Sequence, residues 1–147
     1  MLLTLTAAGG VFSACTAARW YLQRTSRRES AHLGGRVVLT ELWNRGGAFS
    51  LPISREAALL GAAAALGEAL RRSRERPLAG GLLIGGGLSN LWERAREGAV
   101  YDYVRFPKAP DPVGRYVYNL ADFAVLLGAA GLSLGRRGGR REGKKRR

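Results

Sequence analysis

The chain has 147 residues, enough for one domain or a small helical bundle, and a formal net charge of +13. Such a charge is typical of nucleic-acid-binding proteins. Here, however, basic blocks alternate with Gly-, Ala- and Leu-rich runs, a pattern that instead indicates membrane topology. A single cysteine, Cys15, and a single histidine, His32, exclude a disulfide framework and a cysteine-histidine metal cluster.

Four apolar runs follow one another along the chain and predict four membrane-spanning helices. Residues 1–18 carry no charged side chain and form the first, with a signal peptide as the alternative interpretation. Residues 53–70 form the second, with Ser54 as the N-cap. Residues 77–92 begin at Pro77, which is typical of a first helical turn. Residues 116–135 form the last run.

The segments between these runs differ in character. Residues 36–43 are apolar and β-branched and lie between Gly-Gly pairs, which predicts one or two short strands. Residues 98–115 contain three prolines and predict a polar linker. Gly81 and Gly85 have the spacing that lets membrane helices approach closely, with a flexible glycine loop as the alternative. The expected fold class is an all-α membrane protein with four transmembrane helices and a small extracytoplasmic β element between helices 1 and 2.

Basic residues set the expected orientation. The blocks at residues 71–76 and 136–147 follow the second and fourth runs, so the positive-inside rule directs both to the cytoplasm. Arginines between residues 19 and 36 count against this orientation. We expect residues 1–135 to form one membrane domain and residues 136–147 a basic cytoplasmic tail. Aromatic residues near the predicted helix ends, Tyr101 and Tyr103 among them, predict a belt at the membrane interface.

The chemistry of this chain centres on aspartate, of which the sequence holds three. Asp122 lies in an otherwise uncharged run, where an ionisable group costs roughly 2.5–3.5 kcal/mol at a membrane centre, so we expect it to have a partner or a function. With Asp102 it predicts a carboxylate pair at a membrane surface, and two carboxylates that share one proton can hydrolyse a peptide bond. Asn119 is expected on the same helical face as Asp122. Asp111, between two prolines, is expected in a turn.

Four motifs, in the same order and at compatible spacing, resemble those of the lipoprotein signal peptidase (signal peptidase II) family, which are membrane aspartic proteases. The motifs are Asn44-Arg-Gly-Gly-Ala-Phe-Ser50, Gly85-Gly-Gly-Leu-Ser-Asn-Leu-Trp-Glu-Arg94, Val100-Tyr-Asp-Tyr-Val104 and Tyr118-Asn-Leu-Ala-Asp-Phe-Ala124. Together they cover most of the chain, and no single one of them would carry the resemblance.

The resemblance implies an aspartic endopeptidase that removes signal peptides from bacterial prolipoproteins, just before the lipid-modified Cys. Its catalytic residues would be Asp102 and Asp122. The residues implied to bind substrate or support the site are Asn44, Gly46, Ala48, Phe49, Asn90, Arg94 and Asn119. For Asn90 and Arg94, which share a helix face, structural hydrogen bonding is the alternative, and Arg94 is expected to face a polar pocket.

The resemblance also implies partners and a location. The partners would be prolipoprotein substrates and membrane lipid, with no nucleic acid, no metal and no organic cofactor. The location would be the bacterial cell (inner) membrane, as a multi-pass protein with its active site near the extracytoplasmic face.

Three features depart from the family's pattern. The first helix lacks the family's acid, and Arg19 is the candidate to replace its Lys. Glu93 precedes Arg94 where the family has Asp, and Arg105 replaces a second acid after Asp102. These departures leave the aspartate pair intact but keep open a non-catalytic relative that binds lipoprotein or lipid. A basic nucleic-acid-binding protein is the third interpretation.

Overall fold

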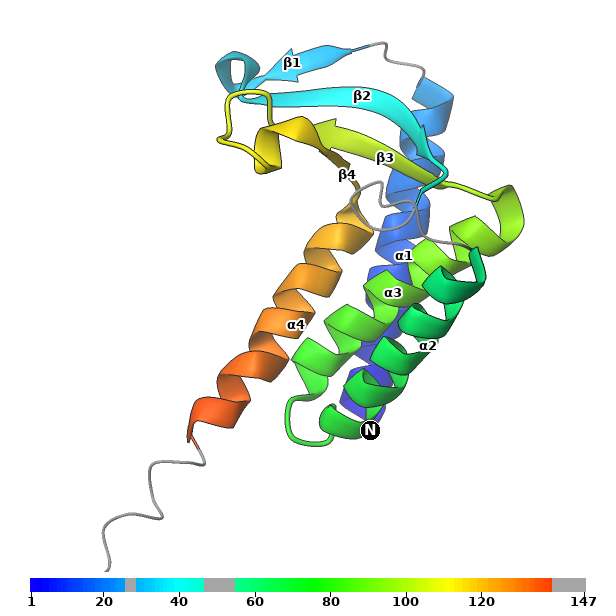
Figure 1. Cartoon of the computed structure of the whole chain (residues 1–147), viewed down its shortest axis with the longest axis vertical. Coiled ribbons are helices and arrows are strands. Elements are labelled where there is room, and N and C mark those ends of the chain that lie inside the picture. Colours follow the sequence, from blue (N-terminus) through cyan, green and yellow to red (C-terminus); the bar gives the residue numbers. More distant parts are fainter. Residues whose placement is uncertain (26–28, 47–54, 139–147) are drawn as a thin grey trace, which may run out of the picture.

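The computed structural model describes residues 1–25, 29–46 and 55–138. Within these ranges the helices are α1 (Leu2–Thr25), α2 (Arg55–Arg72), α3 (Pro77–Glu97) and α4 (Leu120–Gly138), with short 3-10 turns η1 (Leu33–Gly35) and η3 (Val113–Arg115). The strands are β1 (Ser30–His32), β2 (Val37–Asn44), β3 (Val100–Arg105) and β4 (Val117–Tyr118). The helices lie alongside one another, and the strands lie across one end of the bundle (Figure 1).

Helix α3 is in contact with α1, α2 and α4 and forms the centre of the bundle. Glycine allows this close approach. A Cβ atom at Gly81 would lie 2.5 Å from the Cβ of Ala7 in α1, and one at Gly86 would lie 2.6 Å from the carbonyl oxygen of Ala121 in α4. A side chain at either position would displace its neighbour. The interpretation of the glycine run as a closely packed helix is therefore confirmed, and the flexible loop is excluded.

The strands form one antiparallel sheet in the order β1-β2-β3-β4. β1 and β2 lie between α1 and α2 as predicted, whereas β3 and β4 lie between α3 and α4. The interpretation of residues 98–115 as a polar linker is therefore wrong for β3, whose β-branched and aromatic residues favour a strand. The β element is also not confined between helices 1 and 2, so the fold is not all-α: the sheet joins two segments far apart in the sequence.

The predicted strand segment 36–43 is a single strand, β2, and its partner β1 lies upstream of it. The two strands pair with Ser30 opposite Leu39 and His32 opposite Val37. Gly34 and Gly35 make the turn between them with φ angles of +64° and +76°, a conformation that glycine adopts without strain. The predicted turn at this Gly-Gly pair is confirmed.

Several helix ends differ from the predicted ones. Helix α3 does begin at Pro77, but it continues to Glu97 and ends at Gly98, whose φ of +71° is the left-handed conformation common just after a helix. Helix α4 begins at Leu120 rather than at residue 116, because Val117 and Tyr118 pair with β3. Asp122 therefore lies in the first turn of α4 rather than in the middle of a helix. The predicted N-cap Ser54 lies outside the described residues.

Length and apolar composition identify the candidate membrane spans among the described residues. Within the described ranges, α1 is long and apolar enough to cross a bilayer, and residues 120–134 of α4 form a shorter apolar helix. Four membrane spans therefore remain a prediction.

Candidate active site

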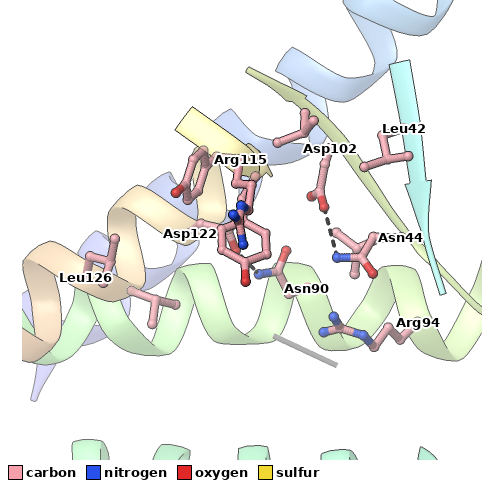
Figure 2. Close-up of a pocket in the computed structure, with 13 residues that line it drawn as sticks. Leu42, Asn44, Asn90, Arg94, Asp102, Arg115, Asp122 and Leu126 are labelled. Carbon is pink, nitrogen blue, oxygen red and sulfur yellow. Dashed lines mark hydrogen bonds between the residues drawn. The ribbon is translucent and has the colours of Figure 1, made fainter. Parts of the chain in front are cut away.

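A pocket of about 210 Å³ lies at the end of the bundle that carries the sheet. Its walls come from β2, α3, β3, η3, β4 and α4. The residues that line it are Leu42, Asn44, Asn90, Arg94, Val100, Asp102, Arg115, Tyr116, Val117, Tyr118, Asp122, Val125 and Leu126. Figure 2 shows both aspartates and both asparagines of this set in one view. The structure thus brings the two predicted catalytic carboxylates into the same pocket.

Asp102 lies on β3 with 3% of its surface exposed. Its Oδ1 accepts a hydrogen bond from Asn119 Nδ2 at 2.7 Å, and its Oδ2 accepts one from Asn44 Nδ2 at 3.1 Å. Backbone N–H groups orient both amides, since that of Gly46 donates to Asn44 Oδ1 and that of Asp122 donates to Asn119 Oδ1, each at 3.0 Å. A backbone N–H can only donate, so the NH₂ end of each asparagine must face Asp102.

Asp122 forms a capping box with Asn119, the residue just before α4. The Asn119 side chain accepts from the Asp122 backbone, and Asp122 Oδ2 accepts in return from the Asn119 backbone N–H at 2.9 Å. Asp122 Oδ1 accepts from Asn90 Nδ2 at 3.0 Å, while Asn90 Oδ1 accepts from Asn119 Nδ2 at 3.1 Å. The expectation that Asn119 shares a helical face with Asp122 is wrong, because Asn119 is the N-cap and reaches Asp122 through the cap.

Burial is the main influence on the charge of this pair. Burial, together with the negative charge of Asp122, raises the pKa of Asp102 from its ordinary 3.8 to about 6. Hydrogen bonds from Asn119 and Asn44 and the charge of Arg94 oppose this rise. A carboxyl with such a pKa holds a proton more readily than an exposed aspartate does. Two neighbouring carboxylates of this kind can share one proton and divide the roles of acid and base.

Arg94 faces the pocket, as expected from its cost in lipid. Its Nη2 donates to the carbonyl oxygen of Gly46 at 3.2 Å, so Gly46 connects Arg94 with Asn44 although it does not itself line the pocket. Asn90 takes part in the carboxylate network itself, so its role is more than helix packing. The predicted site residues Ala48 and Phe49 lie outside the described residues.

Sequence reasoning missed one contributor to this site, Tyr103. Its hydroxyl oxygen accepts a hydrogen bond at 3.0 Å from the backbone N–H of Leu120, the first residue of α4. Tyr101 and Tyr103 are 2% and 7% exposed, so their assignment to an interfacial aromatic belt is wrong. Strand alternation was the available signal, since Tyr101 and Tyr103 flank Asp102 and point to the opposite face of the sheet.

The fold has solved counterparts. A bacterial membrane enzyme solved by the in meso method at 2.3 Å resolution superposes with a TM-score of 0.82, at 15% sequence identity, over 98% of this chain and 93% of the other. A second bacterial membrane enzyme, solved by the same method at 1.9 Å, gives a TM-score of 0.75 at 16% identity. The chain therefore has the fold of a bacterial membrane enzyme.

The sequence comparisons define the family more closely. Residues 9–135 match the family model for signal peptidase (SPase) II, and the chain belongs to that family. A lipoprotein signal peptidase from Methylorubrum extorquens (strain PA1) is 38% identical over 104 residues, which are 63% of this chain and 59% of that protein. One from Methylobacterium sp. (strain 4-46) is 35% identical over 117 residues, 71% of this chain and 68% of that protein. The match to the M. extorquens protein thus spans less than two thirds of its length.

Proposed function

We propose that the chain is a membrane aspartic endopeptidase that removes signal peptides from bacterial prolipoproteins. One observation carries this proposal: Asn119 joins a buried carboxylate, Asp102, to a half-buried one, Asp122, at the wall of one pocket. A purely structural carboxylate needs no second acid that shares its hydrogen-bonding asparagine, and the negative charge of Asp122 disfavours ionisation of Asp102. Membership of the signal peptidase II family supports the same reaction.

The two carboxyls differ in a way that assigns their roles. Asp122 lies in the first turn of α4, where free N–H groups and the helix dipole stabilise a negative charge. Asp102 has a pKa of about 6 and is the better holder of the shared proton. In this scheme Asp122 takes a proton from water as the water oxygen bonds to the scissile carbonyl carbon. Asp102 gives its proton to the carbonyl oxygen, and collapse of the tetrahedral intermediate breaks the C–N bond with proton transfer to the leaving amine.

The walls of the pocket suit a substrate that is part peptide and part lipid. Val125 and Leu126 supply an apolar side of the pocket on α4, and Leu42 adds apolar surface beside Asp102 (Figure 2). Leu126 is 54% exposed on α4, so the apolar side of the pocket continues onto the outer surface of that helix. We therefore propose that the lipid chains of the modified Cys lie along α4 while the peptide bond before that Cys reaches the carboxyls.

The orientation follows from the two ends of the bundle. The sheet and the carboxyl pair lie at one end, and the loop that joins α2 to α3, with its arginines at 71–76, lies at the other (Figure 1). We propose a multi-pass protein of the bacterial cell (inner) membrane, with the basic end in the cytoplasm and the pocket near the extracytoplasmic face. Residues 1–135 would form the membrane domain and residues 136–147 a cytoplasmic tail.

Conservative substitutions test the reaction. Asp102→Asn and Asp122→Asn keep the size of the side chain but remove the titratable proton, so each is expected to abolish cleavage. Losing either should cost nearly as much as losing both, since a pair acts as a unit. The assay follows the mass shift from precursor to mature lipoprotein in purified membranes.

The matched control is Asp111→Asn, because Asp111 is exposed and is not among the residues that line the pocket. It is expected to keep parental activity. Full activity in either Asp102→Asn or Asp122→Asn would refute the aspartic mechanism. A parent protein that binds lipoprotein without cutting it would favour the non-catalytic relative.

A further inference from the structure

A buried ion pair joins α1 to α3 beside the candidate site. Arg19 Nη1 lies 2.6 Å from Glu93 Oε1, and the two side chains are 14% and 9% exposed. The second oxygen of the carboxylate, Oε2, accepts a hydrogen bond from the backbone N–H of Tyr101 at 3.2 Å. Tyr101 directly precedes Asp102 on β3. Glu93 thus connects α1, its own helix α3 and the strand that carries one of the two carboxyls.

The hydrogen bond from Tyr101 to Glu93 holds a part of β3 that pairs with a neighbouring strand on one side only. β4 pairs with β3 at Val104 and Arg105, beyond Asp102. On the other side β2 pairs with Tyr101 through Trp43, whose ring lies 5.3 Å from that of Tyr101. Tyr101 is 2% exposed, so its N–H needs an acceptor within the protein. Glu93 supplies that acceptor where β4 does not.

We propose that Glu93 is a positioning residue for Asp102, and that Arg19 keeps the Glu93 carboxylate ionised and correctly oriented. The proposal rests on the peptidase function proposed above. A carboxylate this deeply buried requires a partner of opposite charge, which Arg19 provides. The pair also accounts for two departures from the family's pattern, since the two unusual residues contact each other.

The expected effect of losing the acceptor follows from the network around Asp102. If the first half of β3 moves relative to α3, the Asp102 carboxyl shifts away from the amides of Asn44 and Asn119. A misplacement of about 1 Å in a catalytic group can reduce turnover by roughly 100-fold. The KM should change less, because the lining of the pocket remains.

Two double variants isolate the acceptor from the ion pair. Arg19→Met with Glu93→Gln removes both charges but leaves a carbonyl oxygen that can accept from Tyr101. Arg19→Met with Glu93→Met removes both charges and the acceptor. Neither variant leaves an unpaired buried charge, so both are expected to fold. The Met variant leaves the Tyr101 N–H without its acceptor and the Gln variant buries an extra NH₂ group, so unfolding curves are measured for both and turnover is compared at a temperature where both are folded.

We expect kcat for prolipoprotein cleavage to be about 10- to 100-fold higher in the Gln variant than in the Met variant, with KM values within about threefold. A second readout does not depend on turnover: difference infrared spectroscopy follows the titration of the Asp102 carboxyl, with matching Asp102→Asn proteins as references. The carboxyl should titrate at higher pH in the Met variant, because the amide hydrogen bonds that favour its ionised form are weakened. The charged groups that face Asp102, Asp122 from α4 and Arg94 from α3, are the same in both variants.

Equal kcat values or equal carboxyl titrations in the two variants would overturn the positioning role of Glu93. Failure of the proposed function has a different signature, a parent protein that does not cut prolipoprotein. In that event the infrared titration still decides whether Glu93 positions Asp102.

Discussion

Asn119 and Asp122 hold each other through two hydrogen bonds of 3.0 and 2.9 Å, each from the backbone N–H of one residue to the side chain of the other. One capping box therefore begins α4 and also orients a carboxylate of the candidate active site. The cap uses the side-chain oxygen of Asn119, and its Nδ2 donates a hydrogen bond to Asp102 Oδ1 at 2.7 Å. The start of the helix and the geometry of the carboxyl pair consequently depend on the same residue.

Asn119→Ser separates these two roles. Serine is a good N-cap, so the stability of the fold should stay within about 0.5 kcal/mol of the parent, whereas Asn119→Ala should lose about 0.5–2 kcal/mol. Alanine has no donor, and the single O–H of serine cannot replace the two bonds that Asn119 Nδ2 donates to Asp102 and Asn90, so both variants should lose roughly 10- to 100-fold in turnover. Thermal unfolding in detergent and the prolipoprotein assay measure the two effects. Parental turnover in Asn119→Ser would contradict the role given to the amide.

The pH dependence of turnover follows from the proton that the pair shares. Burial and the charge of Asp122 raise the pKa of Asp102 to about 6. As pH rises through this region the pair loses its proton and with it the acid, so kcat/KM should fall about tenfold per pH unit at higher pH. A pH-rate profile in a buffer series of constant ionic strength measures the decline. A profile flat from pH 5 to pH 9 would argue against a shared proton.

The same pKa predicts how stability depends on pH. The value of Asp102 is about 6 in the folded chain against an ordinary 3.8. Below 3.8 both states hold the proton and the group has no effect. Between the two values the unfolded chain has released the proton and the folded chain still holds it, so the free energy of unfolding falls as pH rises. The fall is about 3 kcal/mol in all, and the free energy stays reduced above pH 6. Asp102→Asn should reduce this slope between pH 4 and pH 6, as followed by chemical denaturation, and Asp111→Asn should leave it unchanged.

Helix packing predicts that alanine at two glycine positions changes the stability of the fold in opposite directions. Gly86→Ala brings a Cβ to within 2.6 Å of the Ala121 carbonyl oxygen at the start of α4, so it should destabilise the fold by about 1–3 kcal/mol and lower turnover. Gly67→Ala in α2 meets no atom within 4 Å and should stabilise by up to about 1 kcal/mol, with turnover unchanged. Unfolding curves of the two variants beside the parent check both signs. A tolerated Gly86→Ala would show that α3 and α4 can separate at no cost.

The proposed orientation can be checked by labelling. Arg74, in the loop that joins α2 to α3, and Lys108, in the loop that follows β3, are both exposed. Cys15, which is buried, can be replaced by alanine to give a background free of cysteine. A membrane-impermeant thiol reagent added to intact cells should label Lys108→Cys but not Arg74→Cys. In inverted membrane vesicles Arg74→Cys should react directly. Lys108→Cys should react only after the membrane is opened with detergent. The reverse pattern would put the pocket on the cytoplasmic side.

The sequence predicted those features of the fold and the site that are encoded within short stretches of the chain. Pro77 marked the start of α3, and motif spacing identified Asp102 and Asp122 as a pair, because these features involve short stretches. β3 was missed because the prolines that follow it dominated the composition, while the strand itself depends on pairing with β2, far away in sequence. The contact of Arg19 with Glu93, 74 positions apart, had no local signal. The cap in Asn119-Leu-Ala-Asp122 was local and could have been recognised from its spacing.

The lining of the pocket bears on how the protein could be inhibited. None of the described residues that line the pocket is a serine, threonine, cysteine or lysine. An electrophilic compound of the kind that acylates serine or cysteine proteases would find no such side chain to modify there. A compound with a hydroxyl group in the place of the attacking water could donate a hydrogen bond to the ionised carboxylate and accept one from the protonated carboxyl of the pair. Apolar extensions toward Leu126 would add affinity, so we expect tight inhibitors of this protein to be amphipathic and reversible.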